Sequence, residues 1–226
     1  MAGAVGRLVV NWTTVFVASP GNSKSVLEAL SAYAWNGYGG VTFASVVEDA
    51  DTCKESHQAD PIINEWRSSH IEQVRLRLWK DGEIVVQMTF NGTNTHKFNW
   101  FTQSRLLAST YSDLEKLDTR LRFFSLIGYG NGVNRRFYIN KINSGCDENA
   151  GWMFVKDDGY RTDCLYDIYR KYPYFLYATN GHASFWQTEG DYDFADMMSI
   201  QVLQGKDVER EVATTTILPE ELWVPF

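Results

Sequence analysis

The stretch Val74–Thr93, VRLRLWKDGEIVVQMTFNGT, decides the fold expected for this chain. It contains two runs of alternating apolar and polar residues, which are joined by Lys80-Asp81-Gly82. In the first run every second residue from Val74 to Leu78 is apolar, which is the period of a strand with one buried face. An Asp-Gly turn between two such runs is typical of a β-hairpin. The stretch therefore predicts a half-buried antiparallel sheet.

The same stretch ends in a candidate modification site. Asn91-Gly92-Thr93 is an N-glycosylation acceptor in a secreted chain, and Asn11-Trp12-Thr13 is a second one. No signal peptide is visible in Met1–Gly6, and no run approaches the roughly 20 apolar residues of a membrane helix. We therefore predict a secreted, extracellular protein with glycans at Asn91 and Asn11.

Further strand-like runs surround the hairpin at an even spacing, which favours an antiparallel β-sandwich or barrel over βαβ units. The runs are Leu8–Ser19, Val41–Val47, Phe123–Ile127, Arg136–Ile142, Gly151–Lys156, Tyr174–Thr179 and Met197–Leu203. Two short helical insertions are expected, one capped by Ser23 and one over Ser104–Lys116. The chain is thus predicted to be an all-β domain over residues 1–203.

Residues 204–226 form a mixed charged tail that ends in the apolar stretch Ile217–Phe226. We expect this tail to pack on the domain or on a partner. A second copy of the chain is one such partner, and the protein would then form a homo-oligomer.

Charge and composition narrow the class of partner. The 226 residues carry a net charge of −7, which argues against a nucleic-acid partner because phosphate binding needs a basic surface. Aromatic residues make up 15% of the chain, with 12 Tyr, 13 Phe and 8 Trp. Such residues favour strands, and exposed ones stack on ligands.

The three cysteines predict one disulfide. Cys146 and Cys164 bracket a strand and a turn, and a bridge closing a loop of that length stabilises by about 3 kcal/mol. Cys53 is then left as a free thiol or an intermolecular partner.

Three stretches together resemble a group of secreted marine-invertebrate proteins. They are WTTVFVASPGNSKSVL at Trp12–Leu27, FNGTNTHKFNWFTQSRLLASTYSDL at Phe90–Leu114 and RRFYINKINSGCDENAGWMF at Arg135–Phe154. The resemblance spans most of residues 8–203 and implies a single extracellular domain. It carries no catalytic motif and no activity to transfer.

An aromatic and polar surface for sugars is the first candidate site. Sugar-binding modules stack an apolar ring face on Trp or Tyr and satisfy hydroxyls with polar side chains. The residues predicted to serve such a surface are Trp100, Trp186, Gln187, Tyr166, Tyr169, Tyr172 and Tyr174. The alternative is that the tyrosines form a buried cross-strand cluster.

An acidic row is the second candidate. Glu189, Asp191 and Asp193 alternate along one segment, and carboxylate oxygens at that spacing suit Ca²⁺. A solvated acidic turn is the alternative. Asp157-Asp158 and Asp163 form a weaker set of the same kind.

The third candidate is an enzyme. No nucleophile-elbow, zincin or nucleotide-binding motif is present, but His182 and His96 could each act as a general base in an aromatic pocket. The function predicted first is lectin-like recognition of a glycan or a small amphipathic molecule. A cofactor-free oxygenase of the luciferase type, acting on a small aromatic or lipid-like substrate, comes second. An extracellular matrix or assembly module comes third.

Overall fold

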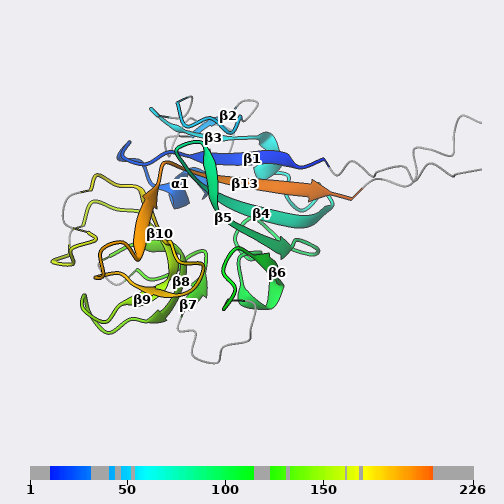
Figure 1. The fold of residues 1–226 in the computed structure, drawn as a ribbon. Coiled ribbons are helices and arrows are strands. Elements are labelled where there is room, and N and C mark those ends of the chain that lie inside the picture. The colour runs from blue at the N-terminus through cyan, green and yellow to red at the C-terminus, as the bar shows by residue number, and fades with distance from the viewer. Residues whose placement is uncertain are drawn as a thin grey trace, which may run out of the picture.

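In the part of the chain that the structure describes, two β-sheets pack face to face (Figure 1). The computed structural model describes residues 11–31, 41–43 (backbone only), 47–51, 54–114, 123–130, 133–160, 162–167 and 170–205. The predicted all-β sandwich is confirmed, and the sheets do not close into a barrel. No helix in the described ranges has the length and apolar character needed to cross a membrane.

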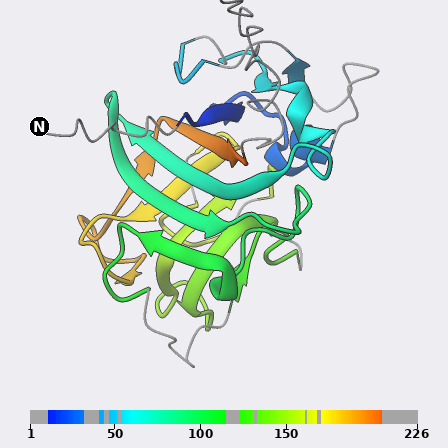
Figure 2. The ribbon, with the colours of Figure 1, turned by 90° about the vertical axis from the view of Figure 1, so that its right-hand side faces the viewer.

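The first sheet holds seven strands, all antiparallel to their neighbours except for the parallel pair β2–β3. Its order is β2 (Val41–Phe43), β3 (His57–Ala59), β1 (Thr13–Ala18), β13 (Met197–Gln204), β4 (Ile71–Lys80), β5 (Glu83–Asn91) and β6 (Leu106–Ser109). Figure 2 shows the long β4–β5 hairpin curving across the strands of the second sheet.

The second sheet has a five-stranded path with a sixth short strand beside it. The path is β12 (Tyr192–Ala195), β10 (Tyr174–Ala178), β9 (Ala150–Lys156), β8 (Arg135–Ile142) and β7 (Phe123–Ser125), and β11 (Ser184–Phe185) pairs with β9. Strands β11 and β12 were not expected from the sequence, because both are short and lie among polar residues.

The β4–β5 hairpin follows the predicted pattern. Asp81 and Gly82 form the turn with φ of 51° and 80°, the conformation that two-residue hairpin loops require. Val74, Leu76 and Leu78 are fully buried between the sheets. The alternate residues of β4 lie on the outer face of the sheet, where they are half-buried.

The helical predictions need two corrections. Helix α1 (Val26–Ser31) is present, but its cap is Ser25, whose hydroxyl accepts a 3.1 Å hydrogen bond from the Glu28 amide. The segment Ser104–Lys116 is not a helix in its described part. It contains the end of a 3₁₀ turn (Gln103–Arg105) and strand β6, because the free edge of β5 offers backbone partners that helix propensity does not outweigh.

The second sheet is buried on both faces. On β9, Met153 and Val155 point into the core between the sheets, whereas Phe154 points away from it into a second cluster. On β10, Phe175 lies in the first core and Leu176 in the second. We call the second group the outer aromatic cluster. It consists of Tyr138, Phe154, Cys164, Tyr166, Tyr174, Leu176, Trp186 and Phe194.

The predicted disulfide is confirmed and closes the outer aromatic cluster. Cys146 and Cys164 are bonded across 18 positions of sequence, and Cys164 is itself 4% exposed. The bridge ties the loop after β9 to the turn after β8, over the outer face of the sheet. Cys53 lies outside the described residues.

Candidate functional site

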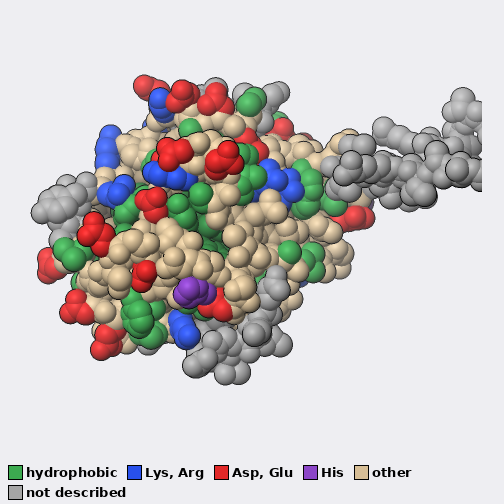
Figure 3. All heavy atoms as spheres, viewed as in Figure 1, with side chains coloured by type: hydrophobic (Ala, Val, Ile, Leu, Met, Phe, Trp, Pro, Cys, Tyr) green, Lys and Arg blue, Asp and Glu red, His purple; other side chains and the backbone are tan. Residues whose placement is uncertain are grey.

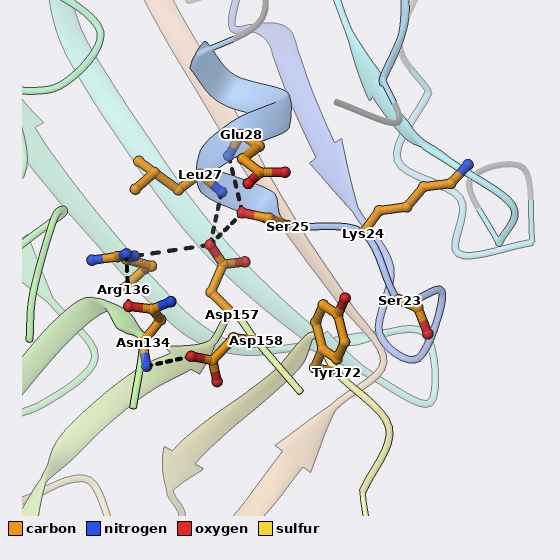
Figure 4. Close-up of a pocket in the computed structure, with 10 residues that line it drawn as sticks. All are labelled: Ser23, Lys24, Ser25, Leu27, Glu28, Asn134, Arg136, Asp157, Asp158 and Tyr172. Atoms are coloured by element: carbon orange, nitrogen blue, oxygen red, sulfur yellow. Dashed lines mark hydrogen bonds and ion pairs between the residues drawn. The ribbon is translucent and has the colours of Figure 1, made fainter. Parts of the chain in front are cut away.

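A polar cleft of about 370 Å³ opens where the N-terminus of α1 meets the ends of β8 and β9. Figure 4 shows its lining side chains, which come from α1 and the segment before it, from the start of β8, from the chain after β9 and from the segment before β10. The lining residues are Ser23, Lys24, Ser25, Leu27, Glu28, Asn134, Arg136, Asp157, Asp158 and Tyr172.

Asp157 builds one wall of this cleft by capping α1 from the opposite sheet. Its Oδ2 accepts a 2.7 Å bond from the Ser25 hydroxyl and a 3.1 Å bond from the Leu27 amide, and its Oδ1 accepts a 2.6 Å bond from Val26 N. Burial raises the pKa of this carboxyl to about 6, although the bonds from Ser25 and the two amides act against that rise. Since both oxygens are engaged, Asp157 positions the wall and does not offer a free acid or base.

His57 supports the same segment from behind. Its Nε2 donates to the Lys24 carbonyl at 3.0 Å, and its Nδ1 lies 3.5 Å from Asn22 Nδ2, which fixes a neutral ring. The side chain is fully buried, and this burial lowers the pKa of His57 to about 4. The cleft segment is therefore held by two buried titratable groups whose pKa values are shifted in opposite directions.

In acid, the wild-type protein is expected to lose unfolding free energy because of His57. Replacement of His57 by glutamine should abolish this loss. Below pH 6.5 the unfolded histidine takes up a proton that the folded one refuses until the pH reaches about 4. The wild-type protein should therefore lose up to about 1.4 kcal/mol of unfolding free energy per pH unit across this window. Urea unfolding at pH 7.5 and 4.5 measures the effect.

The exposed His182→Gln is the control for this experiment, and it should keep the wild-type slope. The raised pKa of Asp157 makes stability change with pH in the opposite direction to that caused by His57. Its stabilising contribution decreases as the pH rises toward about 6, because the folded state holds a proton there that the unfolded state releases above 3.8. An unchanged slope in His57→Gln would contradict the assignment of His57.

Tyr172 is the aromatic residue of the cleft, and it is partly exposed. In Figure 4 its ring stands between Asp158 and Ser23, with the hydroxyl directed toward the chain that leads into α1. Two backbone bonds hold this arrangement, from Gly21 N to Pro173 O at 2.8 Å and from Ser23 N to Tyr172 O at 2.9 Å. The backbone at Tyr172 is therefore held beside the chain that leads into α1.

Polar groups converge around this ring. The Asp158 Oδ2 accepts a 2.9 Å bond from Asn134 N, and Lys156 Nζ donates to the other oxygen. Asn134 Oδ1 accepts from Arg136 at 3.0 Å, so its amide NH₂ group remains a donor for the cleft. Glu28 is exposed at the rim and, within the described ranges, forms no ion pair. The cleft thus offers acceptors, a donor and one ring face.

The structure separates the predicted sugar-stacking residues. Trp100 is 0% exposed in the core between the sheets, stacked 6.3 Å from Trp66. Trp186 is equally buried in the outer aromatic cluster, 5.0 Å from Phe154. Neither ring presents a face at the surface, so neither forms the expected exposed stacking surface.

The outcome differs among the four predicted tyrosines. Tyr166 and Tyr174 are buried in the outer aromatic cluster, where Tyr174 donates a hydrogen bond to Asp167 and the Tyr166 hydroxyl accepts one from Asn149 Nδ2 at 2.6 Å. The cross-strand alternative holds for these two. Tyr169 lies outside the described residues. Tyr172 alone lines the cleft.

Gln187 and the acidic row lie elsewhere. Gln187 donates a 3.3 Å hydrogen bond to Asp147 near the outer aromatic cluster. Asp191 accepts from Asn180 at 3.0 Å, whereas Asp193 hydrogen-bonds with Tyr177, and Glu189 is exposed in the turn that precedes both. Across the described ranges, no group of three His, Cys, Asp or Glu side chains is gathered closely enough to hold a metal ion.

The two predicted histidine bases are also apart from the cleft. His182 is exposed on a turn, with its Nδ1 2.8 Å from the Asn180 carbonyl. His96 is half-buried and lines a hollow together with Trp66 and Phe98. The sequons are accessible, since Asn91 and Asn11 are both exposed.

Most cleft residues were missed by sequence reasoning because they come from four separate segments. One local signal was present. Ser25 and Glu28 have the Ser-x-x-Glu spacing of a capping box, which identifies the true start of α1. The pair Asp157-Asp158 was singled out as a weak cation set, but its main partners in the structure are protein groups. Comparison with protein-family models, with curated proteins and with solved structures finds no match for this chain.

Proposed function

We propose that this protein is an extracellular, lectin-like recognition protein that binds a glycan in the Tyr172 cleft. The observation that carries the proposal is the partly exposed Tyr172, whose ring lines the cleft with Glu28, Asn134 and Asp158 and whose backbone carbonyl accepts a hydrogen bond from Ser23 N. An apolar sugar face stacks on such a ring while its hydroxyls bond to carboxylates and amides. The cleft volume of about 370 Å³ lies within the range of small-ligand sites.

Secretion belongs to the same proposal. The Cys146–Cys164 disulfide supports an oxidising compartment, and exposed sequons at Asn91 and Asn11 support glycosylation there. The proposed extracellular location agrees with the proposed ligand, because glycans are abundant outside the cell.

Tyr172→Ala is expected to weaken glycan binding at least about tenfold, equivalent to about 1.4 kcal/mol, whereas Tyr172→Phe keeps the ring and most of the affinity. A glycan array with and without added calcium first selects a neutral oligosaccharide, and calorimetry then measures its affinity for each variant. Tyr160→Ala is the matched control, because Tyr160 is 60% exposed and does not line the cleft.

Gly159→Val provides a second, independent variant. A Cβ atom at Gly159 would lie 3.2 Å from Tyr172 Cε1, so a larger side chain presses on the ring and leaves its chemistry unchanged. It should weaken binding without a matching loss of stability. The proposal fails if no glycan binds in either calcium condition, or if Tyr172→Ala and Tyr160→Ala bind equally well.

The catalytic alternative has narrower support. It rests on His96, which lines a hollow with two aromatic residues, whereas His182 lies on an exposed turn. Among the described residues neither histidine forms an ion pair with a carboxylate. Turnover of a small aromatic substrate that His96→Ala abolishes would favour this alternative.

A further inference from the structure

A second set of hollows lies away from the Tyr172 cleft, between the segment that precedes β4 and the loop that follows β5. Three hollows of about 370, 350 and 380 Å³ adjoin one another there, because they share lining residues. Arg67 lines all three, and His96 and Asn94 each line two. We call this continuous feature the Arg67 groove.

The two walls of the groove are locked together. Trp66 donates from its indole nitrogen to Thr95 Oγ1 at 3.0 Å, and the Thr95 hydroxyl donates to Gly92 O at 2.6 Å. Both bonds are buried, and Trp66 is only 3% exposed. The separation of the walls is therefore set by the fold, as in preformed ligand sites.

The groove is rich in cationic and donor groups. Arg67, His70, His96 and Lys97 line it, against the acidic side chains of Glu65 and Glu72. The two formal cations of the groove are matched by its two carboxylates, whereas the chain as a whole is acidic, with 28 acidic and 21 basic residues, and the face shown in Figure 3 carries many acidic side chains. The group that favours an anionic ligand here is the Arg67 guanidinium, which presents several donors in a geometry that suits carboxylate or sulfate.

Arg67 and His96 are the best-placed donors. Arg67 is exposed and has no ion pair within the described ranges. His96 Nδ1 accepts a 3.3 Å bond from Phe98 N, which leaves Nε2–H as the donor of the neutral ring. Amides from Asn64, Asn94 and Asn99 lie along the same groove, and amides of this kind bond to sugar hydroxyls.

The backbone also departs from its usual conformations at this place. His70 and Asn94 have φ of 46° and 57°, and both line the hollow that Arg67 shares with the start of β4. Such conformations cost energy in a residue with a side chain, and they gather at ligand-binding sites. The same conformation occurs at Asp81 in the β4–β5 turn, so here it fixes the course of the two turns that border the hollow.

We propose that the Arg67 groove binds an oligosaccharide that carries an anionic group, with the anion held by the Arg67 guanidinium and His96 Nε2–H. Three adjoining hollows of 350 to 380 Å³ each offer more room than a single small anion fills. The proposal does not depend on the function of the Tyr172 cleft.

Calorimetry with three tetrasaccharides tests the proposal: a sulfated glycosaminoglycan fragment, its desulfated uronate counterpart, and a neutral maltotetraose. N-glycans are removed beforehand, because Thr93 of the Asn91 sequon lines the third hollow. At least one acidic probe should bind, and the neutral probe should not bind in this groove. Comparison of the two acidic probes tells whether sulfate or carboxylate is the preferred anion.

Variants place the binding in the groove. Arg67→Ala should weaken the acidic probe at least tenfold at an unchanged melting temperature, and Arg67→Lys should restore part of the affinity. Arg170→Ala is the charge-matched control, since Arg170 is exposed over Phe194 on the other sheet. Tyr172→Ala should leave binding of the acidic probe intact, which separates this site from the cleft.

Two results would overturn the proposal. One is the absence of binding by both acidic probes at millimolar concentration. The other is an equal loss of affinity in Arg67→Ala and Arg170→Ala, which would mean that the probe responds to overall charge only.

Discussion

Arg135→Met should lower the free energy of unfolding by about 3–5 kcal/mol, the cost of leaving a buried charge without its partner. The Arg135 and Asp167 side chains are 5% and 0% exposed, and their nearest charged atoms are 3.6 Å apart. The guanidinium lies among the rings of the outer aromatic cluster, 5.1 Å from the Phe154 centroid and 5.5 Å from that of Tyr166. Methionine keeps much of the stem but removes the charge, so Asp167 is left uncompensated.

Urea unfolding followed by near-ultraviolet circular dichroism measures this loss. The double variant Arg135→Met/Asp167→Asn should lose less than the sum of the two single variants, because it removes both charges together. Arg67→Met is the control, since this exposed arginine lies outside the outer aromatic cluster and should cost less than about 1 kcal/mol. A loss below about 1 kcal/mol for Arg135→Met would show that the pair does not hold the outer aromatic cluster together.

Removal of the disulfide is expected to cost about 3 kcal/mol, the loop-closure value for a bridge of this span. Cys146→Ser/Cys164→Ser should also loosen the outer aromatic cluster, because Cys164 packs there beside Tyr166 and Trp186. The core between the sheets contains neither cysteine and should stay packed.

The experiment is best made in a Cys53→Ser background, which prevents thiol exchange and serves as the reference. Chemical unfolding gives the stability difference, and fluorescence quenching reports access to tryptophan. An unfolding free energy equal to that of the reference would rule out a stabilising role for the bridge.

The parts of the fold that sequence predicts are those where burial has a local period. The alternation of β4 marks a one-sided strand, and the hairpin forms as expected. The unbroken apolar run 150–155 within β9 marks a strand but does not say what covers its second face. That cover comes from Cys164, Tyr166 and Trp186, which are brought over the sheet by loops. Trp186 was therefore expected at the surface and is found inside.

The same reasoning explains the outcome for the sites. Asp157 caps α1 from about 130 positions away in the sequence. No local sequence pattern indicates a hydrogen bond over that separation. Tyr172 was selected with its neighbours for its ring alone, and its partial exposure beside the chain at Gly21 and Ser23 distinguishes it from the buried Tyr174. The helix predicted over Ser104–Lys116 failed because the edge of β5 provides a partner that a single-segment argument does not contain.

Burial on both faces of the second sheet limits which amino-acid substitutions this protein can accept during evolution. Every position of β9 and β10 is buried, so each side chain there is fixed by neighbours on one side of the sheet or the other. On β5, in contrast, exposed or half-buried positions alternate with buried ones. Sequence drift should therefore accumulate on the hairpin and spare β9 and β10. A distant relative would be found more readily through the short stretch GWMFVK than through the longer hairpin that first reveals the fold.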